Sequence, residues 1–98
     1  MVRLRIECTR SRRAGEIHER ITHVGGRDAQ GVPWTQTQAD AIRAIHEGER
    51  AFYLLEGDEE LEVVIRQGEM GHEFLTVVKD GETQKRLRAL PPCKTPAT

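Results

Sequence analysis

The sequence contains no long run of hydrophobic residues, and this absence excludes a helix that spans a membrane. Such a helix needs about 18 or more apolar residues in succession, whereas this chain of 98 residues is 32% charged and 37% hydrophobic. Residues 2–8 alternate charged and apolar side chains, so they lack the unbroken apolar stretch of a secretory signal peptide. We therefore expect a cytoplasmic protein whose two cysteines stay reduced.

Aromatic residues are also scarce, with one Trp, one Tyr and two Phe. Proteins that bind single-stranded nucleic acid stack bases on exposed aromatic side chains, and we expect Trp34, Phe52, Tyr53 and Phe74 to lie mostly in the core. A net charge of −1 and a pI near 6.4 argue further against a dedicated nucleic-acid-binding protein.

Charge is unevenly distributed along the chain. Residues 1–30 hold seven Arg and four acidic residues, residues 31–62 hold two Arg and eight acidic residues, and residues 63–98 hold six basic and four acidic residues. Both ends of the chain are therefore mildly basic and its middle is acidic. Charge blocks of this kind usually form solvated faces of a protein.

Hydrophobic periodicity predicts an α+β fold. Val2, Leu4, Ile6 and Cys8 share one face of a period-two pattern, which is typical of a half-buried strand. A helix is predicted at about 37–47, because Thr35 or Thr37 can cap its start and Gly48 follows its end. Strands are predicted at 51–55, 61–66 and 73–78, and Asp80-Gly81 is typical of a hairpin turn that leads into another strand at 83–88.

Two earlier segments are less regular. Residues 9–15 are polar without periodicity and are predicted to form a loop. Ile17, Ile21 and Val24 recur at helical spacing, so a short helix near 16–23 capped by Gly25 is expected to lead into extended residues 22–24, although a short strand is the alternative. Residues 25–33 are predicted to form a loop that Trp34 anchors on the core.

These patterns predict one α+β domain over residues 1–93, followed by a flexible tail at 94–98. The expected architecture is an antiparallel four- to five-stranded β-meander sheet, with one main α-helix at about 37–47 packed on one face. No internal repeat or low-complexity segment is present.

Several short motifs occur in a characteristic order. They are Ile21-Thr22-His23-Val24-Gly25-Gly26, Trp34 ahead of the Thr-led helix with Ala41-Ile42, Phe52-Tyr53, Gly71-His72-Glu73-Phe74-Leu75-Thr76, Leu87, and Leu90-Pro91-Pro92-Cys93. Because these motifs follow one another in this order and spacing, the chain resembles the bacterial domain-of-unknown-function family numbered 3892, over about residues 3–93. The resemblance implies a small single-domain bacterial protein and carries no activity, cofactor, partner or site residue.

A metal centre is the most specific chemical hypothesis. Cys8, His18, His23 and Cys93 would form a Cys₂His₂ set if the C-terminal residues return to the first strand. The closely spaced ligand pairs of structural zinc sites are absent, however. The preferred interpretation is that Cys8 is an inert, inward-facing core residue and that Cys93 holds the tail by burial alone, so no metal or other cofactor is expected.

Enzymatic motifs are weak. A buried Cys8 would be a poor nucleophile, and His72 and Glu73, as neighbours in a strand, point to opposite faces. Gly25-Gly26 lacks the lysine and the strand–loop–helix context of a phosphate-binding loop, so a helix cap and a turn are favoured. No catalytic residue is assigned, and the chain is expected not to be an enzyme.

Two kinds of binding remain. Arg10, Arg12 and Arg13, joined by Arg27 and by Arg86 or Arg88, could form a basic rim for the phosphates of a nucleic acid. Alternatively, an open sheet edge could accept a partner strand or a second copy of the chain, and Lys85, Arg86 and Arg88 would guard such an edge. We favour an accessory protein that acts by protein–protein association, with weak nucleic-acid binding as the alternative.

Overall fold

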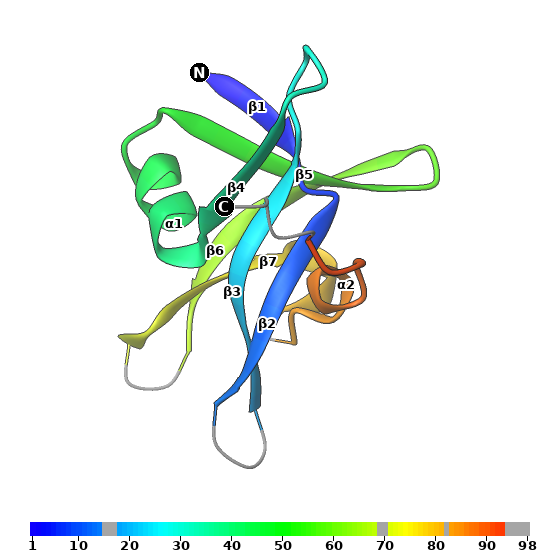
Figure 1. Cartoon of the computed structure of the whole chain (residues 1–98). Coiled ribbons are helices and arrows are strands. Elements are labelled where there is room, and N and C mark those ends of the chain that lie inside the picture. The colour runs from blue at the N-terminus through cyan, green and yellow to red at the C-terminus, as the bar shows by residue number, and fades with distance from the viewer. Residues whose placement is uncertain (15–17, 69–70, 82, 94–98) are drawn as a thin grey trace.

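Two β-sheets and one main helix make up the computed structural model shown in Figure 1. The structure describes residues 1–14, 18–68, 71–81 and 83–93, and only the backbone of residues 12–14 and 18–20. The four-stranded sheet has the order β1-β5-β6-β7 and the three-stranded sheet the order β2-β3-β4. The elements are β1 (Val2–Arg5), β2 (Cys8–Ala14), β3 (His18–Arg27), β4 (Pro33–Thr37), α1 (Gln38–His46), β5 (Arg50–Glu56), β6 (Glu59–Gln67), β7 (Glu73–Val77), a 3-10 turn (Val78–Asp80) and α2 (Lys85–Arg88).

The chain changes sheet between β1 and β2. The Ile6 amide donates a hydrogen bond to the carbonyl of Tyr53 in β5, whereas the next amide, that of Glu7, donates to the carbonyl of Gly25 in β3. β1 pairs with β5 in parallel, and β2 pairs with β3 in antiparallel orientation. This corner brings the two sheets together around one core.

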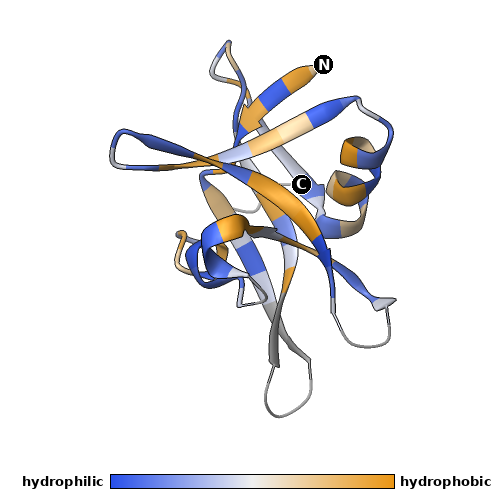
Figure 2. Cartoon of the chain, turned by 180° about the vertical axis from the view of Figure 1, so that it is seen from behind, coloured by the Kyte–Doolittle hydropathy of each residue, from blue (hydrophilic) through white to orange (hydrophobic). Residues whose placement is uncertain are grey.

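The core lies between the two sheets. Hydrophobic and hydrophilic residues alternate along β1, as Figure 2 shows, so Val2 and Leu4 share one face of the strand. Leu4 is buried in the core, whereas Val2, at the start of the strand, stays 54% exposed. Phe52 in the central strand β5 is fully buried, and its ring lies 5.6 Å from that of Trp34. The other buried hydrophobic residues of this core are Ile6, Ile21, Val24, Ala41, Ile42, Leu54, Leu61, Val63, Leu75, Val77 and Leu87.

The predicted main helix is confirmed. The Oγ1 atom of Thr37 accepts a hydrogen bond from the Asp40 amide at 3.1 Å and caps the start of α1. Gly48 adopts φ +70° just beyond its end, a conformation that favours glycine. α1 packs against β3, β5 and β7 through Ala41, Ile42 and Ala44.

The α+β class, a four-stranded sheet and the strands β5, β6 and β7 are also as expected. The chain forms two sheets rather than one, however, and β1 joins the four-stranded sheet in parallel rather than antiparallel orientation. Trp34 packs against the core, as predicted for the anchor of the preceding loop. That loop is shorter than expected, because β3 continues to Arg27. It is closed by Asp28, whose Oδ1 atom accepts the amides of Gln30 and Val32.

Three predicted segments are wrong. Residues 9–14 form strand β2 rather than a loop, and residues 18–23 belong to β3 rather than to a short helix. Residues 83–88 do not form a hairpin strand, because α2 begins at Lys85. The first two errors have one physical cause. β2 and β3 pair with each other along most of their length, so interstrand hydrogen bonds stabilise residues that have little hydrophobic patterning of their own.

Two further predictions concern the residues outside the described ranges and the absence of a membrane-spanning helix. The start of the predicted short helix and the predicted tail at 94–98 lie outside the described residues. Among the helices of the described ranges, none is long and apolar enough to cross a membrane.

Candidate functional site

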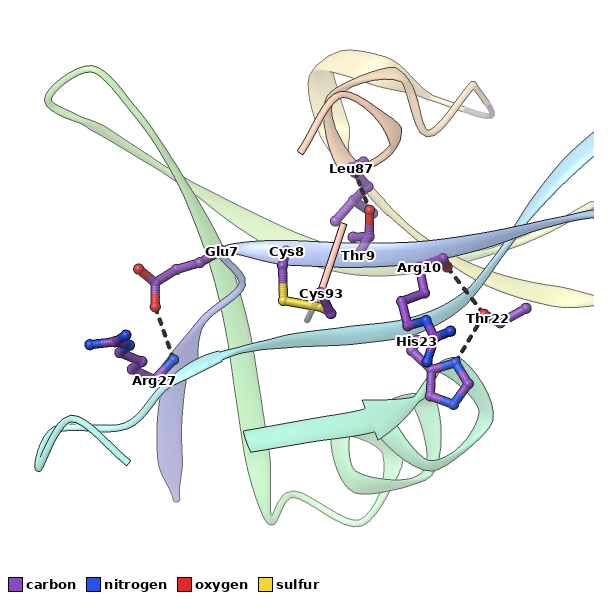
Figure 3. Close-up of a disulfide and its surroundings, with 9 residues drawn as sticks. All are labelled: Glu7, Cys8, Thr9, Arg10, Thr22, His23, Arg27, Leu87 and Cys93. Atoms are coloured by element: carbon purple, nitrogen blue, oxygen red, sulfur yellow. Dashed lines mark hydrogen bonds between the residues drawn. A yellow bond between two sulfur atoms is a disulfide. The ribbon is translucent and has the colours of Figure 1, made fainter. Parts of the chain in front are cut away.

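A disulfide joins the beginning of β2 to the end of the described chain. Cys8 and Cys93 are 85 residues apart in sequence, and their Cα atoms lie 4.8 Å apart (Figure 3). Cys93 is buried and Cys8 is half-buried. The expectation of two separate reduced thiols is therefore wrong for this structure. The C-terminal residues are held by a covalent bond as well as by burial.

Residues 91–93, which we call the C-terminal segment, lie along β2 on the side away from β3. The Thr9 amide donates to the carbonyl of Pro91, and the Cys93 amide donates to the carbonyl of Thr9, each at 3.1 Å. These bonds form a parallel bridge between Thr9 and Pro92. The buried Thr9 hydroxyl also donates to the carbonyl of Leu87 at 2.9 Å (Figure 3). Thr9 thus connects β2 to both α2 and the C-terminal segment.

Gly25 and Gly26 make room for this arrangement. A Cβ atom at Gly25 would lie 2.7 Å from the Trp34 carbonyl oxygen and 3.1 Å from the Sγ atoms of Cys8 and Cys93. A Cβ atom at Gly26 would approach the Arg5 carbonyl oxygen to under 3.0 Å. Neither glycine has a positive φ. Both lie within β3, close to its C-terminal end, so the predicted helix cap and turn are wrong, and the glycines serve close packing instead.

We expect Gly26→Ala to lower the free energy of unfolding by about 1–3 kcal/mol, because the new methyl group must displace backbone atoms of the β1–β2 corner. Urea denaturation followed by circular dichroism measures the change. Thr35→Ala, at an exposed position in the adjoining strand β4, is the matched control and should change stability by less than about 0.5 kcal/mol. Equal stabilities for the two variants would contradict the packing role of Gly26.

A hollow of about 340 Å³ lies where β2, α2 and the C-terminal segment meet. β2 contributes Thr9, Arg10 and Ser11 to it, and the C-terminal part of the chain contributes Arg88, Leu90 and Pro92. We call it the arginine hollow, because Arg10 borders it from one side and Arg88 from the other. Both arginines are exposed, and no carboxylate among the described residues lies within 4.0 Å of either guanidinium.

Several other basic side chains of the described residues are paired with carboxylates. The guanidinium of Arg86 binds Glu56 and Asp80, and these hydrogen bonds raise its pKa above the ordinary value. Hydrogen bonds to Glu62 and Glu60 likewise raise the pKa of Arg3. The acidic β5–β6 hairpin therefore pairs with Arg3, Lys79 and Arg86, whereas Arg10 and Arg88 have no carboxylate partner among the described side chains.

The predicted basic rim is only partly brought together. Arg10, Arg12 and Arg13 follow one another along β2, and Arg88 joins Arg10 at the hollow. Arg27 is the last residue of β3, and its amide donates a hydrogen bond to the Glu7 carboxylate there (Figure 3). It therefore does not belong to the rim. Arg86 does not belong to the rim either, because its guanidinium is already paired with Glu56 and Asp80. The sequence alone does not reveal which of these arginines meet, because α2 was predicted to be a strand.

The four metal-ligand candidates do not form a centre in the described structure. Cys8 and Cys93 are bonded to each other, which removes both thiolates that zinc would require. The Nδ1 atom of His23 lies 2.9 Å from the Thr22 hydroxyl (Figure 3), and the side chain of His18 is outside the description. Within the described ranges, no three His, Cys, Asp or Glu side chains are grouped as metal ligands.

Sequence reasoning missed Thr9 as part of this region, and it assigned Gly25 to the wrong structure. The signal that was present is the β-branched run Ile21-Thr22-His23-Val24, which was noted as a possible strand. A strand there, followed directly by two glycines without a turn, would have suggested a close approach of neighbouring backbone or sulfur atoms.

Comparison with known families agrees with the resemblance noted from the sequence. Residues 5–91 match the model of the family described as "Protein of unknown function (DUF3892)". No curated protein and no solved structure matches the chain. The matched range includes β2, the two glycines of β3, α2 and Pro91, and it therefore includes most of the arginine hollow. The chain belongs to this family of proteins of unknown function, DUF3892.

Proposed function

We propose that this chain is a non-enzymatic accessory protein that binds an extended acidic segment of another protein along β2. The observation that carries the proposal is the pair Arg10 and Arg88, which border one hollow. Neither has a carboxylate partner among the residues whose side chains the structure describes, and the Arg88 guanidinium donates one hydrogen bond, to the Thr83 carbonyl at 2.8 Å. Guanidinium groups bind carboxylates through charge-assisted hydrogen bonds. An acidic partner would supply carboxylates, which the described part of the chain does not place beside these two arginines.

The edge of β2 supports an extended partner. β2 is the outer strand of its sheet, and beyond Thr9 no described strand pairs with residues 11–14 on the side away from β3. We call this side the free edge of β2. The same strand already accepts one extended segment at Thr9. A partner strand that continued this line would add main-chain hydrogen bonds beside Arg10, Arg12 and Arg13.

The proposed association uses a different edge from the one predicted from the sequence. Residues 83–88 were expected to be a guarded edge strand, but they contain α2. Self-association is less well supported than an external partner, because four carboxylates of the acidic β5–β6 hairpin of a second copy, those of Glu56, Glu59, Glu60 and Glu62, would arrive already paired.

Nucleic-acid binding by the arginines of β2 is the alternative. It is supported by three arginines within four residues of one strand. The aromatic residues weigh against single-stranded nucleic acid, which needs stacking surfaces. Phe52 is buried, Trp34 packs on it, and the guanidinium of Arg3 covers the ring of Tyr53 at 4.0 Å.

A bacterial, cytoplasmic protein is also part of the proposal. The bacterial origin follows from the resemblance noted in the sequence, and the mixed charged composition suits a cytoplasmic protein. In a reducing compartment the Cys8–Cys93 bond would be reversible rather than permanent.

A labelled peptide of alternating glutamate and valine tests the proposal by fluorescence anisotropy. We expect saturable binding that weakens with added salt, and the double variant Arg10→Glu/Arg88→Glu should weaken it by at least about tenfold. Arg66→Glu is the matched control, because Arg66 is exposed on β6 and has no ion pair among the described residues. It should leave the affinity nearly unchanged.

Other outcomes distinguish the alternatives. Tighter binding of oligothymidylate, lost in the same double variant, would replace the protein partner with a nucleic acid. A molecular mass that rises with concentration and falls in the double variant would indicate a second copy of the chain. Equal losses in the double variant and in Arg66→Glu would contradict a specific site, because then only net charge matters.

A further inference from the structure

We propose that thiol–disulfide exchange at Cys8–Cys93 controls how much of the β2 edge is open to a partner strand. The inference rests on the proposed function, because it concerns access to the same edge. Its basis is the position of the C-terminal segment, which occupies β2 at Thr9, next to the free edge.

The C-terminal segment closes the edge that it covers. Pro91 and Pro92 are exposed and lack backbone N–H groups, so the segment offers almost no donors to a further strand. Proline on an outer strand is a known means of preventing edge-to-edge pairing. With the disulfide intact, a partner strand can use residues 11–14 but not the amide and carbonyl of Thr9, which the segment occupies.

The disulfide decides whether this closure persists. Apart from it, the segment is held by two backbone hydrogen bonds to Thr9 and by the burial of Cys93. The net gain from two such bonds is of the same order as the conformational entropy lost when a short segment is ordered. Reduction therefore leaves the segment free to exchange with a partner strand. α2 stays in place, because Leu87 is fully buried and the Thr9 hydroxyl binds its carbonyl oxygen.

The chemistry requires a dithiol reductant. Its thiolate attacks the Sγ atom of Cys8, the more exposed of the two cysteines, and forms a mixed disulfide while Cys93 leaves as a thiolate. The second thiol of the reductant then attacks the mixed disulfide and releases Cys8. Two electrons and two protons pass to the protein, which ends with two thiols, and the reductant ends as a disulfide.

The structure around the bond is compatible with a reversible step. Gly25 places no side chain against the two sulfur atoms, so only backbone flanks them on that side. No ion pair or salt-bridge network joins the C-terminal segment to the rest of the described chain. Release of residues 91–93 then breaks few interactions.

Hydrogen exchange and peptide binding, measured on the full chain, test the inference together. The samples are the oxidised protein, the protein reduced with dithiothreitol, and the double variant Cys8→Ser/Cys93→Ser. We expect reduction to speed exchange of the Thr9 and Cys93 amides by at least about tenfold, while the amides of β5 stay protected. The glutamate–valine peptide should bind about tenfold more tightly to the reduced protein and to the double variant than to the oxidised protein.

Each contrary result identifies what fails. Unchanged exchange at Thr9 and Cys93 on reduction would overturn the inference, and so would faster exchange with unchanged peptide affinity. Loss of protection throughout the chain would also overturn it, because the bond would then maintain the whole fold. If neither redox state binds the peptide, both this inference and the proposed acidic partner are wrong. Peptide binding that is equal in both states and sensitive to Arg10→Glu/Arg88→Glu would leave only the proposed function standing.

Discussion

Replacing Cys8 and Cys93 with serine lowers the free energy of unfolding by about 2–5 kcal/mol relative to the oxidised protein. The bond closes a loop of 85 residues, and the chain-entropy model gives about 4–5 kcal/mol for a loop of this length. Engineered and natural disulfides often contribute less than the model figure, which sets the lower end of the range. Few single features of so small a domain contribute as much.

Urea denaturation of three samples measures this effect. The oxidised protein should unfold at the highest midpoint, and the reduced protein and the double serine variant should unfold at nearly the same lower midpoint. The single variant Cys93→Ser is the control for polarity, because it also removes the bond but leaves one cysteine. Agreement of all samples within about 0.5 kcal/mol would show that the bond does not form or does not constrain the unfolded chain.

Phe52→Ala is the second change with a large expected effect, a loss of about 3–5 kcal/mol of unfolding free energy. Phe52 is fully buried in the central strand β5, and its ring lies against that of Trp34. Truncation removes buried apolar surface and leaves a cavity between two sheets, where neighbouring backbones are fixed by strand pairing.

The same denaturation experiment checks this prediction with two further variants. Phe52→Leu should cost clearly less than Phe52→Ala, because more of the volume is retained. Val78→Ala, at a position 67% exposed, should change stability by less than about 0.5 kcal/mol. A loss below about 1 kcal/mol for Phe52→Ala would be incompatible with a single core centred on β5.

The candidate site is a meeting of parts that are distant in sequence. Arg10 and Arg88 are separated by 78 residues, and they border one hollow because Leu87 is buried in the core and Thr9 binds its carbonyl oxygen. The same contacts bring Cys93 to Cys8. A basic surface and a disulfide therefore share one anchoring residue, Thr9.

The sequence was sufficient for features that depend on local interactions. The helix at 38–46 follows from the Thr37 cap, the Ala41-Ile42 stripe and Gly48. The strands β5, β6 and β7 follow from short apolar segments separated by glycine-containing turns. In each case the interactions that stabilise the element lie within it or within the next turn, so periodicity and capping reveal it.

Only the tertiary structure decided the parts that concern function. β2 is polar and β3 contains two glycines, and both are strands because each supplies the other's hydrogen-bond partners. Whether Cys8 was core filling, a metal ligand or one half of a disulfide depended on where Cys93 lies, and that depended on the burial of Leu87 and the pairing of Thr9. These are contacts between residues about 80 positions apart, and no local pattern in the sequence encodes such a distance.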